Sequence, residues 1–297
     1  MFEVLFIETV ELMVVVVAGV ACENIANSKA KPMAGSAEKV VRKEYRELTD
    51  AERARFHSAL NWVKKVATVD GRPIYELITC FHNPADAANH MGPSFFPWHR
   101  EYIKVLELML RLYDVRVALP YWDRLWIKRF RIQRTPFFGL LCFWATLMAL
   151  LLVDHLRTSP SEPSFFLLHS FIDYLWERWR HLKQSYKQRE TDYPSKNSSL
   201  CNRQIYAAKS VLHPFDSLTN LDGISNWFTN ELYTYEPHPT CSASDPHCDS
   251  NYLFCDVKTE WCVPKIKEGG ACYGIEEVKD ACFGLNAYCV NGNCSKA

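Results

Sequence analysis

Two short segments of the chain share a pattern that could bind a metal ion. Residues 95–99 read Phe-Phe-Pro-Trp-His and residues 165–169 read Phe-Phe-Leu-Leu-His, so each has two aromatic residues, two further residues and a histidine. A glutamate follows each histidine by eight residues, at Glu107 and Glu177. Histidine is the commonest metal ligand in proteins. A duplicated helix of this kind is what a two-fold metal site in a helical bundle would leave in a sequence.

Helical periodicity places both histidines on apolar faces. On a 3.6-residue repeat, each shares its face with large apolar residues: His99 with Ile103, Leu106 and Leu110, and His169 with Ile172, Trp176 and Trp179. Both imidazoles are therefore expected to point into the core. One histidine on an apolar face is most often an ordinary core residue, but two in matching frames favour a functional pair.

A second signal lies upstream, where His82, His90 and His99 fall within 18 residues. Residues 83–93 contain Asn-Pro and Gly-Pro pairs, which are typical of turns. Three neutral imidazoles suit copper, zinc, iron or nickel. A purely structural role would leave three partly desolvated imidazoles close together, each requiring hydrogen bonds for both nitrogens. The cluster therefore predicts a metal site.

Longer motifs around these histidines resemble the tyrosinase and hemocyanin (type 3 copper) family. His82, residues 90–102 and the Leu-Pro-Tyr-Trp-Asp of residues 119–123 are similar to the first copper half-site of that family. Residues 162–169 and 172–176 are similar to the end of its second half-site. Further similarities are found at residues 42–50 and at the Tyr-Thr-Tyr of residues 233–235, so the resemblance covers about residues 40–123 and 157–240.

The resemblance implies a mainly α-helical bundle around a dinuclear copper site within residues 40–240. It assigns His82, His90 and His99 to the first copper and His169 to the second. The implied activity is oxidation of monophenols and o-diphenols to o-quinones. The expected cofactor is therefore two copper ions, and the expected partners are a small phenol and dioxygen. No catalytic base is assigned, because the residues that deprotonate the phenol in relatives lie mainly beside histidines that are missing here.

The second half-site departs from the family pattern. In relatives a longer stretch follows the Pro-Tyr-Trp-Asp motif and carries a His-x3-His pair that supplies two ligands of the second copper, whereas this chain contains no His-x3-His. His155 stands alone and is assigned no ligand role. Activity is expected to be impaired. The alternative function is a non-catalytic secreted or membrane-tethered protein with a degenerate copper domain and a partner-binding cysteine-rich module.

Residues 124–156 form an atypical apolar insertion that replaces part of the second half-site. Four basic residues precede residues 135–153, which carry no charge and have the length of a transmembrane helix. A span there would separate His99 from His169, and would leave the sequon at Asn197 on the outer side. We favour a stretch foreign to the domain, such as a read-through intron. Sequencing the transcript across codons 120–160 tests this, and an uninterrupted cDNA would refute it.

Composition narrows the class of protein. Lysine plus arginine equals aspartate plus glutamate at 34 each, so nothing points to nucleic acid, and membrane contact is expected only if residues 135–153 are a true span.

Residues 12–21 are an apolar run that predicts a signal peptide over residues 1–22, although Glu3, Glu8 and Glu11 stand where positive charge is usual. A buried strand or a wrongly chosen start of the gene are the alternatives.

Cysteines mark the C-terminal end of the chain. Eight of the twelve lie in residues 241–297, which predicts a small disulfide-rich module and a secreted, extracellular protein, with membrane anchoring as the alternative. The absence of Cys-x2-Cys pairs argues against zinc. Four bridges allow 105 pairings, and the sequence does not choose among them. The module is expected to be a cap, an adhesion surface or a stabilising tail.

The elements that must position the histidines follow from apolar periodicity. Helices are expected at residues 50–66, 98–113 and 165–183, with residues 74–82 leading to the first histidine. Residues 184–200 are polar and are expected to form a loop. Asp173, four residues after His169, could orient a neighbouring group, but we expect an exposed or capping acid.

Overall fold

A computed structural model describes residues 38–67, 71–82, 90, 92–123, 159–194, 204–278 and 280–296. The signal-peptide prediction, the apolar insertion with its transmembrane alternative, His155 and the sequon all lie outside these residues. No helix in the described ranges is long and apolar enough to cross a membrane.

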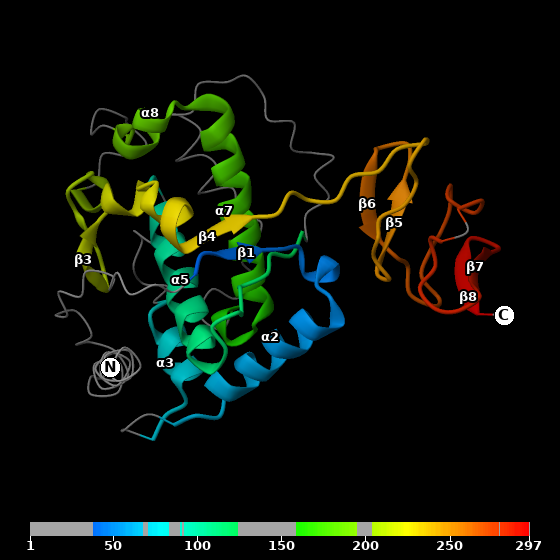
Figure 1. Cartoon of the computed structure of the whole chain (residues 1–297), viewed down its shortest axis with the longest axis horizontal. Coiled ribbons are helices and arrows are strands. Elements are labelled where there is room, and N and C mark those ends of the chain that lie inside the picture. Colours follow the sequence, from blue (N-terminus) through cyan, green and yellow to red (C-terminus); the bar gives the residue numbers. More distant parts are fainter. Residues whose placement is uncertain are drawn as a thin grey trace.

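Helices form the body of the protein (Figure 1). They are α2 (Asp50–Val63), α3 (Ile74–Cys80), α5 (Phe95–Tyr113), α7 (Ser164–Lys183) and α8 (Tyr186–Thr191). Single helical turns are η2 (Tyr45–Glu47), η4 (Ser159–Ser161), η5 (Gln204–Tyr206), η6 (Asp222–Ile224) and the π-helical turn η7 (Phe228–Leu232). The mainly helical class that the sequence predicts is confirmed.

Local sequence sets most of the helix ends. A capping box opens α2, where the Thr49 hydroxyl accepts a hydrogen bond from the N–H of Glu52 and the Glu52 carboxylate accepts one from the N–H of Thr49. Helix α5 begins at Phe95, three residues earlier than expected. Pro97 is tolerated in the first turn, because the N–H group that proline lacks would have no hydrogen-bond acceptor within the helix at that position. The loop expected after α7 was wrong in part, since Ser185 and Gln188 form a second capping box that opens α8.

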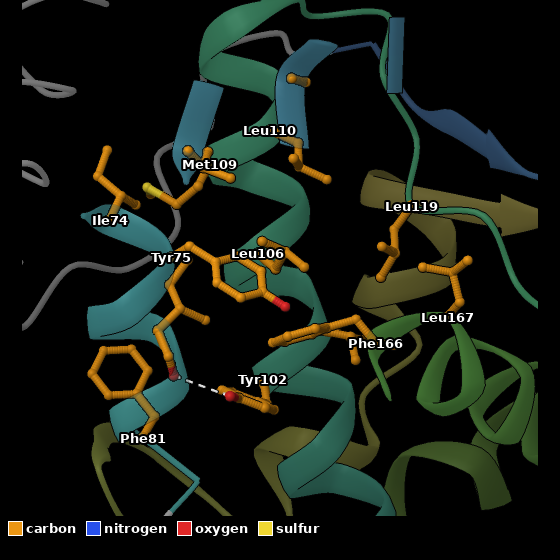
Figure 2. Packing of buried hydrophobic residues seen from close by; sticks show 14 of the residues in the cluster. Ile74, Tyr75, Phe81, Tyr102, Leu106, Met109, Leu110, Leu119, Phe166 and Leu167 are labelled. Carbon is orange, nitrogen blue, oxygen red and sulfur yellow. Dashed lines mark hydrogen bonds between the residues drawn. The ribbon is translucent and has the colours of Figure 1, made fainter. Parts of the chain in front are cut away.

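The hydrophobic core lies between α2, α3, α5 and the start of α7 (Figure 2). Figure 2 shows Tyr102 of α5 facing α3, where its hydroxyl donates to the carbonyl of Ile78 at 3.0 Å. Phe166 of α7 is fully buried against the ring of Tyr102 at 5.1 Å between centroids. A buried tyrosine whose hydroxyl is satisfied fixes the spacing of the two helices it touches. This packing sets α3, α5 and α7 in the positions from which the histidines project.

Short strands close the helical body. Strand β1 (Val40–Arg42) pairs in parallel with β4 (Tyr233–Tyr235), so the beginning and the end of the domain are joined. Strands β2 (Val211–Leu212) and β3 (Phe215–Thr219) form a hairpin beside α3 and α5, where the ring of Phe215 lies 5.6 Å from that of Trp98.

The C-terminal module consists of two hairpins, β5 (Leu253–Asp256) with β6 (Trp261–Pro264) and β7 (Ala287–Val290) with β8 (Asn293–Lys296). Figure 1 shows it at one end of the molecule, linked to the helices by the chain after β4. Each hairpin carries two opposed cysteines that bond to upstream cysteines, giving Cys241–Cys255, Cys248–Cys262, Cys272–Cys289 and Cys282–Cys294. The module is thus two copies of one unit, and its four disulfides confirm the predicted disulfide-rich character.

The module contacts the helical body at η2. The Ser250 hydroxyl donates to the carbonyl of Arg46 at 3.0 Å, and the guanidinium of Arg53 lies 4.6 Å from the centre of the Tyr252 ring. Burial, followed by the negative charge of Glu44, raises the pKa of Glu47 to about 7. A carboxyl group that is partly neutral near pH 7 therefore lies beside this contact.

Candidate metal centre

Three elements and one turn bring four histidines together. His82 lies two residues after the end of α3, and its N–H donates to the carbonyl of Thr79 at 3.2 Å, so its backbone continues the helical turn. His99 lies in the second turn of α5 and His169 in the second turn of α7. His90 precedes α5. All four side chains are buried, and for His99 and His169 this confirms the inward orientation predicted from the apolar faces.

His82, His90 and His99 form a compact set in which one ligand atom from each lies within 4.8 Å of the others. The Nε2 atoms of His82 and His90 are 2.9 Å apart. No other set of three metal-ligating side chains in the described parts of the chain is free of disulfides, since the remaining clusters are cysteines bonded in the module. The structure thus places the first three predicted ligands around one point.

Helix α5 orients one of these imidazoles by its own backbone. The Nδ1–H of His99 donates to the carbonyl of Phe95 at 2.8 Å, which leaves Nε2 with the lone pair in the neutral ring. That Nε2 atom is buried and has no hydrogen-bond partner. A buried acceptor without a partner is costly, and a metal ion between the three rings would satisfy it. The donor set therefore fits a cation such as copper.

Burial keeps the imidazoles of His82 and His99 neutral. Desolvation, followed by repulsion from His90, lowers the pKa of His82 to about 3. Desolvation also lowers the pKa of His99 well below its ordinary value, and the neighbouring His169, His82 and His90 lower it further. Only the neutral imidazole can donate a lone pair to a metal. The site therefore presents ligands that need lose no proton at pH 7.

His169 approaches this set from α7. Its ring lies parallel to that of His99, with 4.1 Å between centroids and 5° between planes. Desolvation lowers the pKa of His169 well below its ordinary value, with the charges of His82 and His90 as further causes. The Nδ1 atom of His169 is buried without a hydrogen-bond partner. His169, the predicted ligand of the second copper, thus lies in contact with His99, and its role as a ligand stays a prediction.

Aromatic rings enclose the four imidazoles. Phe165 lies 4.9 Å from His82 and 4.3 Å from His169 between ring centroids, and Trp98 lies 4.8 Å from His99. Phe165 itself is only half-buried. These rings exclude water from the imidazoles, and in a site of low dielectric constant interactions with charge are stronger.

A buried network of charges, which the sequence reasoning missed, joins the two histidine helices. Asp173 is 4% exposed, and its carboxylate accepts hydrogen bonds from Arg100 Nε and from the hydroxyls of Tyr233 and Tyr235, each at 2.7 Å. The expectation of an exposed or capping acid was therefore wrong. Arg100 directly follows His99, and Asp173 lies one turn beyond His169, so the pair ties the helices together at the site.

The duplicated glutamates anchor the same network. Glu107 accepts hydrogen bonds from Arg42 Nη2 at 2.7 Å and Nε at 3.0 Å, and Glu177 forms ion pairs with Arg100 and Arg180. All these charged side chains are buried. The matched spacing of the glutamates was visible in the sequence, but two of their arginine partners, Arg42 and Arg100, lie 65 and 77 residues away along the chain.

The fold and the site together define a helical domain in which two similar helices present histidines to one buried position. A family model described as the common central domain of tyrosinase matches residues 54–138 and 148–182. A tyrosinase-like protein of Caenorhabditis elegans is 30% identical over 339 aligned positions, covering 86% of this chain and 47% of that protein. The tyrosinase of Streptomyces antibioticus is 37% identical over 91 positions, covering 28% of this chain and 31% of that enzyme.

Solved structures of similar shape are a functional unit of octopus hemocyanin and the deoxygenated hemocyanin of Rapana thomasiana. The match to the octopus unit has a TM-score of 0.45 and 19% identity, and it covers 67% of this chain and 68% of the octopus chain. The match to the Rapana protein has a TM-score of 0.46 and 21% identity, and it covers 67% of this chain and 70% of the Rapana chain.

The chain belongs to the type 3 copper family of tyrosinases and hemocyanins. It spans less than half the length of the curated relatives described above. The family model covers part of the apolar insertion and leaves out residues 139–147. A foreign origin of the insertion stays a prediction, as do the ligand roles of the four histidines.

Proposed function

We propose that the protein is a copper-dependent oxidoreductase of the tyrosinase type, which oxidises phenols or o-diphenols to o-quinones with dioxygen. Family membership supports the class of reaction. The observation that carries the proposal for this chain is the set of three buried imidazoles of His82, His90 and His99, with Nε2 of His99 unpartnered. His82, His90 and His99 would hold the first copper, and His169 would contribute to the second.

Bound copper would supply the redox chemistry with dioxygen. In the overall reaction, two o-diphenols each lose two electrons and two protons, and one dioxygen is reduced to two waters. The chain's own residues bind and position: the Phe95 carbonyl orients His99, and the rings around the site exclude water. Phe165 is half-buried beside two of the imidazoles and would offer its ring to an incoming phenol.

We also propose that the protein is secreted. Its four disulfides support folding in an oxidising compartment, where such bonds persist. Detection of the disulfide-bonded chain in culture medium after expression in animal cells would test this, and retention of a reduced chain inside the cells would contradict it.

The enzyme proposal is tested by oxygen consumption with L-DOPA after loading the full chain with excess copper. We expect oxygen uptake and darkening that His99→Gln abolishes. His57→Gln is the matched control, because His57 is exposed on α2, away from the site, and its Nε2 atom forms a hydrogen bond of 2.8 Å with the hydroxyl of Tyr45. If the copper-loaded wild-type chain consumes no oxygen with L-DOPA or with catechol, the oxidase proposal is wrong and the non-catalytic alternative gains support.

A further inference from the structure

The two sides of the candidate centre offer different numbers of ligands. The α3 and α5 side brings three imidazoles within 4.8 Å of one another. The α7 side, within the residues that the structure describes, brings His169 alone. Two equivalent copper ions would require six imidazoles if each were held like the first.

A census of the ten histidines shows that six cannot be assembled. Four are at the site. Five are placed elsewhere: His57 beside Tyr45, His181 exposed on α7, His213 exposed on the β2–β3 hairpin, His238 against Asp123 and Trp261, and His247 exposed in the module. His181 is twelve residues beyond His169, which places it about 18 Å further along the same helix. His155 is the one histidine outside the described residues, so the second side can gather at most two.

Resting on the proposed copper chemistry, we infer that the chain binds its two copper ions unequally: one tightly at His82, His90 and His99, and one weakly at His169.

The number of imidazole ligands sets the expected difference between the dissociation constants of the two copper ions. Loss of even a hydrogen bond that supports a ligand typically costs about 10- to 100-fold in metal affinity. The second ion lacks at least one whole imidazole relative to the first, so its dissociation constant should be at least about 100-fold higher. At copper concentrations between the two constants, the chain should carry a single, isolated copper ion.

Copper binding to the full chain tests this without any substrate. The metal-free protein is loaded with CuCl2, dialysed against a weak competing chelator and assayed for copper by mass spectrometry and for unpaired spins by electron paramagnetic resonance. We expect about one copper per chain and a Cu(II) signal that accounts for all of it, because an isolated Cu(II) ion is paramagnetic. Two coppers per chain that resist dialysis equally, with most of the spin signal lost to coupling, would overturn the inference, as would no retained copper.

Variants separate the two sides. His82→Gln should lose the retained copper, whereas His169→Gln and its control on the same helix, His181→Gln, should keep about one copper per chain. Loss of the retained copper in His169→Gln, with an unchanged circular dichroism spectrum, would show that His169 belongs to the tight site and would overturn the inference. His169→Asn, which is smaller, repeats this measurement if the first variant misfolds.

The inference and the proposed function fail in different ways. One retained copper without oxygen uptake at any copper concentration refutes the oxidase and leaves the unequal binding intact. Two tightly held coppers with oxygen uptake leave the oxidase intact and refute the unequal binding. If both are right, oxygen uptake should rise only with the copper added beyond the first ion.

Discussion

Replacing Asp173 with alanine would remove the carboxylate that joins the two histidine-bearing helices. Burial opposes its ionisation, but the charges of Arg100 and Arg42 and hydrogen bonds from Tyr233 and Tyr235 hold the pKa of the Asp173 carboxyl below its usual value. The substitution leaves the Arg100 Nε donor and two tyrosine hydroxyls without the partner they have at 2.7 Å. Removing one partner from a buried ion pair typically costs about 3–5 kcal/mol.

The surrounding network limits this loss. Arg100 keeps Glu177 and Arg42 keeps Glu107, so neither guanidinium becomes an isolated buried charge. We therefore expect the lower half of that range, about 3–4 kcal/mol. For a domain of about 200 residues, each kcal/mol lowers the melting temperature by about 2–4 °C, so the expected decrease is about 6–16 °C.

Thermal unfolding of the copper-free protein, followed by circular dichroism, measures the effect. Asp114→Ala is the matched control, because Asp114 also makes three hydrogen bonds, all to Arg116, at the protein surface. Exposed ion pairs contribute little to stability, so this control should leave the melting temperature almost unchanged. If both variants lowered it equally, burial would not be the source of the stabilisation and the reasoning would be refuted.

Three further variants probe the module and the turn before α5. Glu47→Gln should remove a pH dependence of the melting temperature. The folded chain favours the protonated form of Glu47, because its pKa is raised to about 7, so the wild-type chain should lose stability relative to the variant as the pH rises from 4.5 to about 7. Equal melting temperatures of the two chains across that range would contradict this. Cys248→Ser with Cys262→Ser opens a loop of 14 residues and should destabilise the module by about 3 kcal/mol, seen as faster proteolysis of the module with copper retention unchanged. Gly92→Ala should destabilise the helical body by about 1–2 kcal/mol in urea unfolding. Gly92 has a φ of +78°, and an added Cβ would lie 2.8 Å from the Tyr206 ring. Unaltered stability would show that this turn tolerates a side chain.

Elements with strong periodicity could be predicted from the sequence, and short or long-range features could not. Helix α7 was expected at residues 165–183 and runs from Ser164 to Lys183, because twenty residues carry enough apolar positions to show the repeat. Helix α8 has six residues and no buried side chain, so periodicity could not reveal it. Its only local signal was the Ser-x-x-Gln capping box.

The network around Asp173 shows why a site is harder to predict than a helix. Asp173 was expected to be exposed, because a buried acid is stable only with partners, and these lie 73 residues away at Arg100 and 60 residues away at Tyr233. Only the fold brings them together. The disulfides pose the same problem, since Cys255 and Cys262 face each other across a hairpin yet bond to other cysteines.

The two histidine helices are duplicated in their support as well as in their ligands. Each carries a glutamate two turns beyond its histidine, and each glutamate binds a buried arginine, Arg42 at Glu107 and Arg100 at Glu177. None of these contacts involves residues 124–158. The position of His169 beside His99 therefore depends on residues that the chain retains, which explains how α7 can hold its imidazole in place although the His-x3-His pair of the second half-site is missing. The proposed single strong copper site therefore requires no loss of fold, because the contacts that hold α7 in place do not depend on the missing His-x3-His pair.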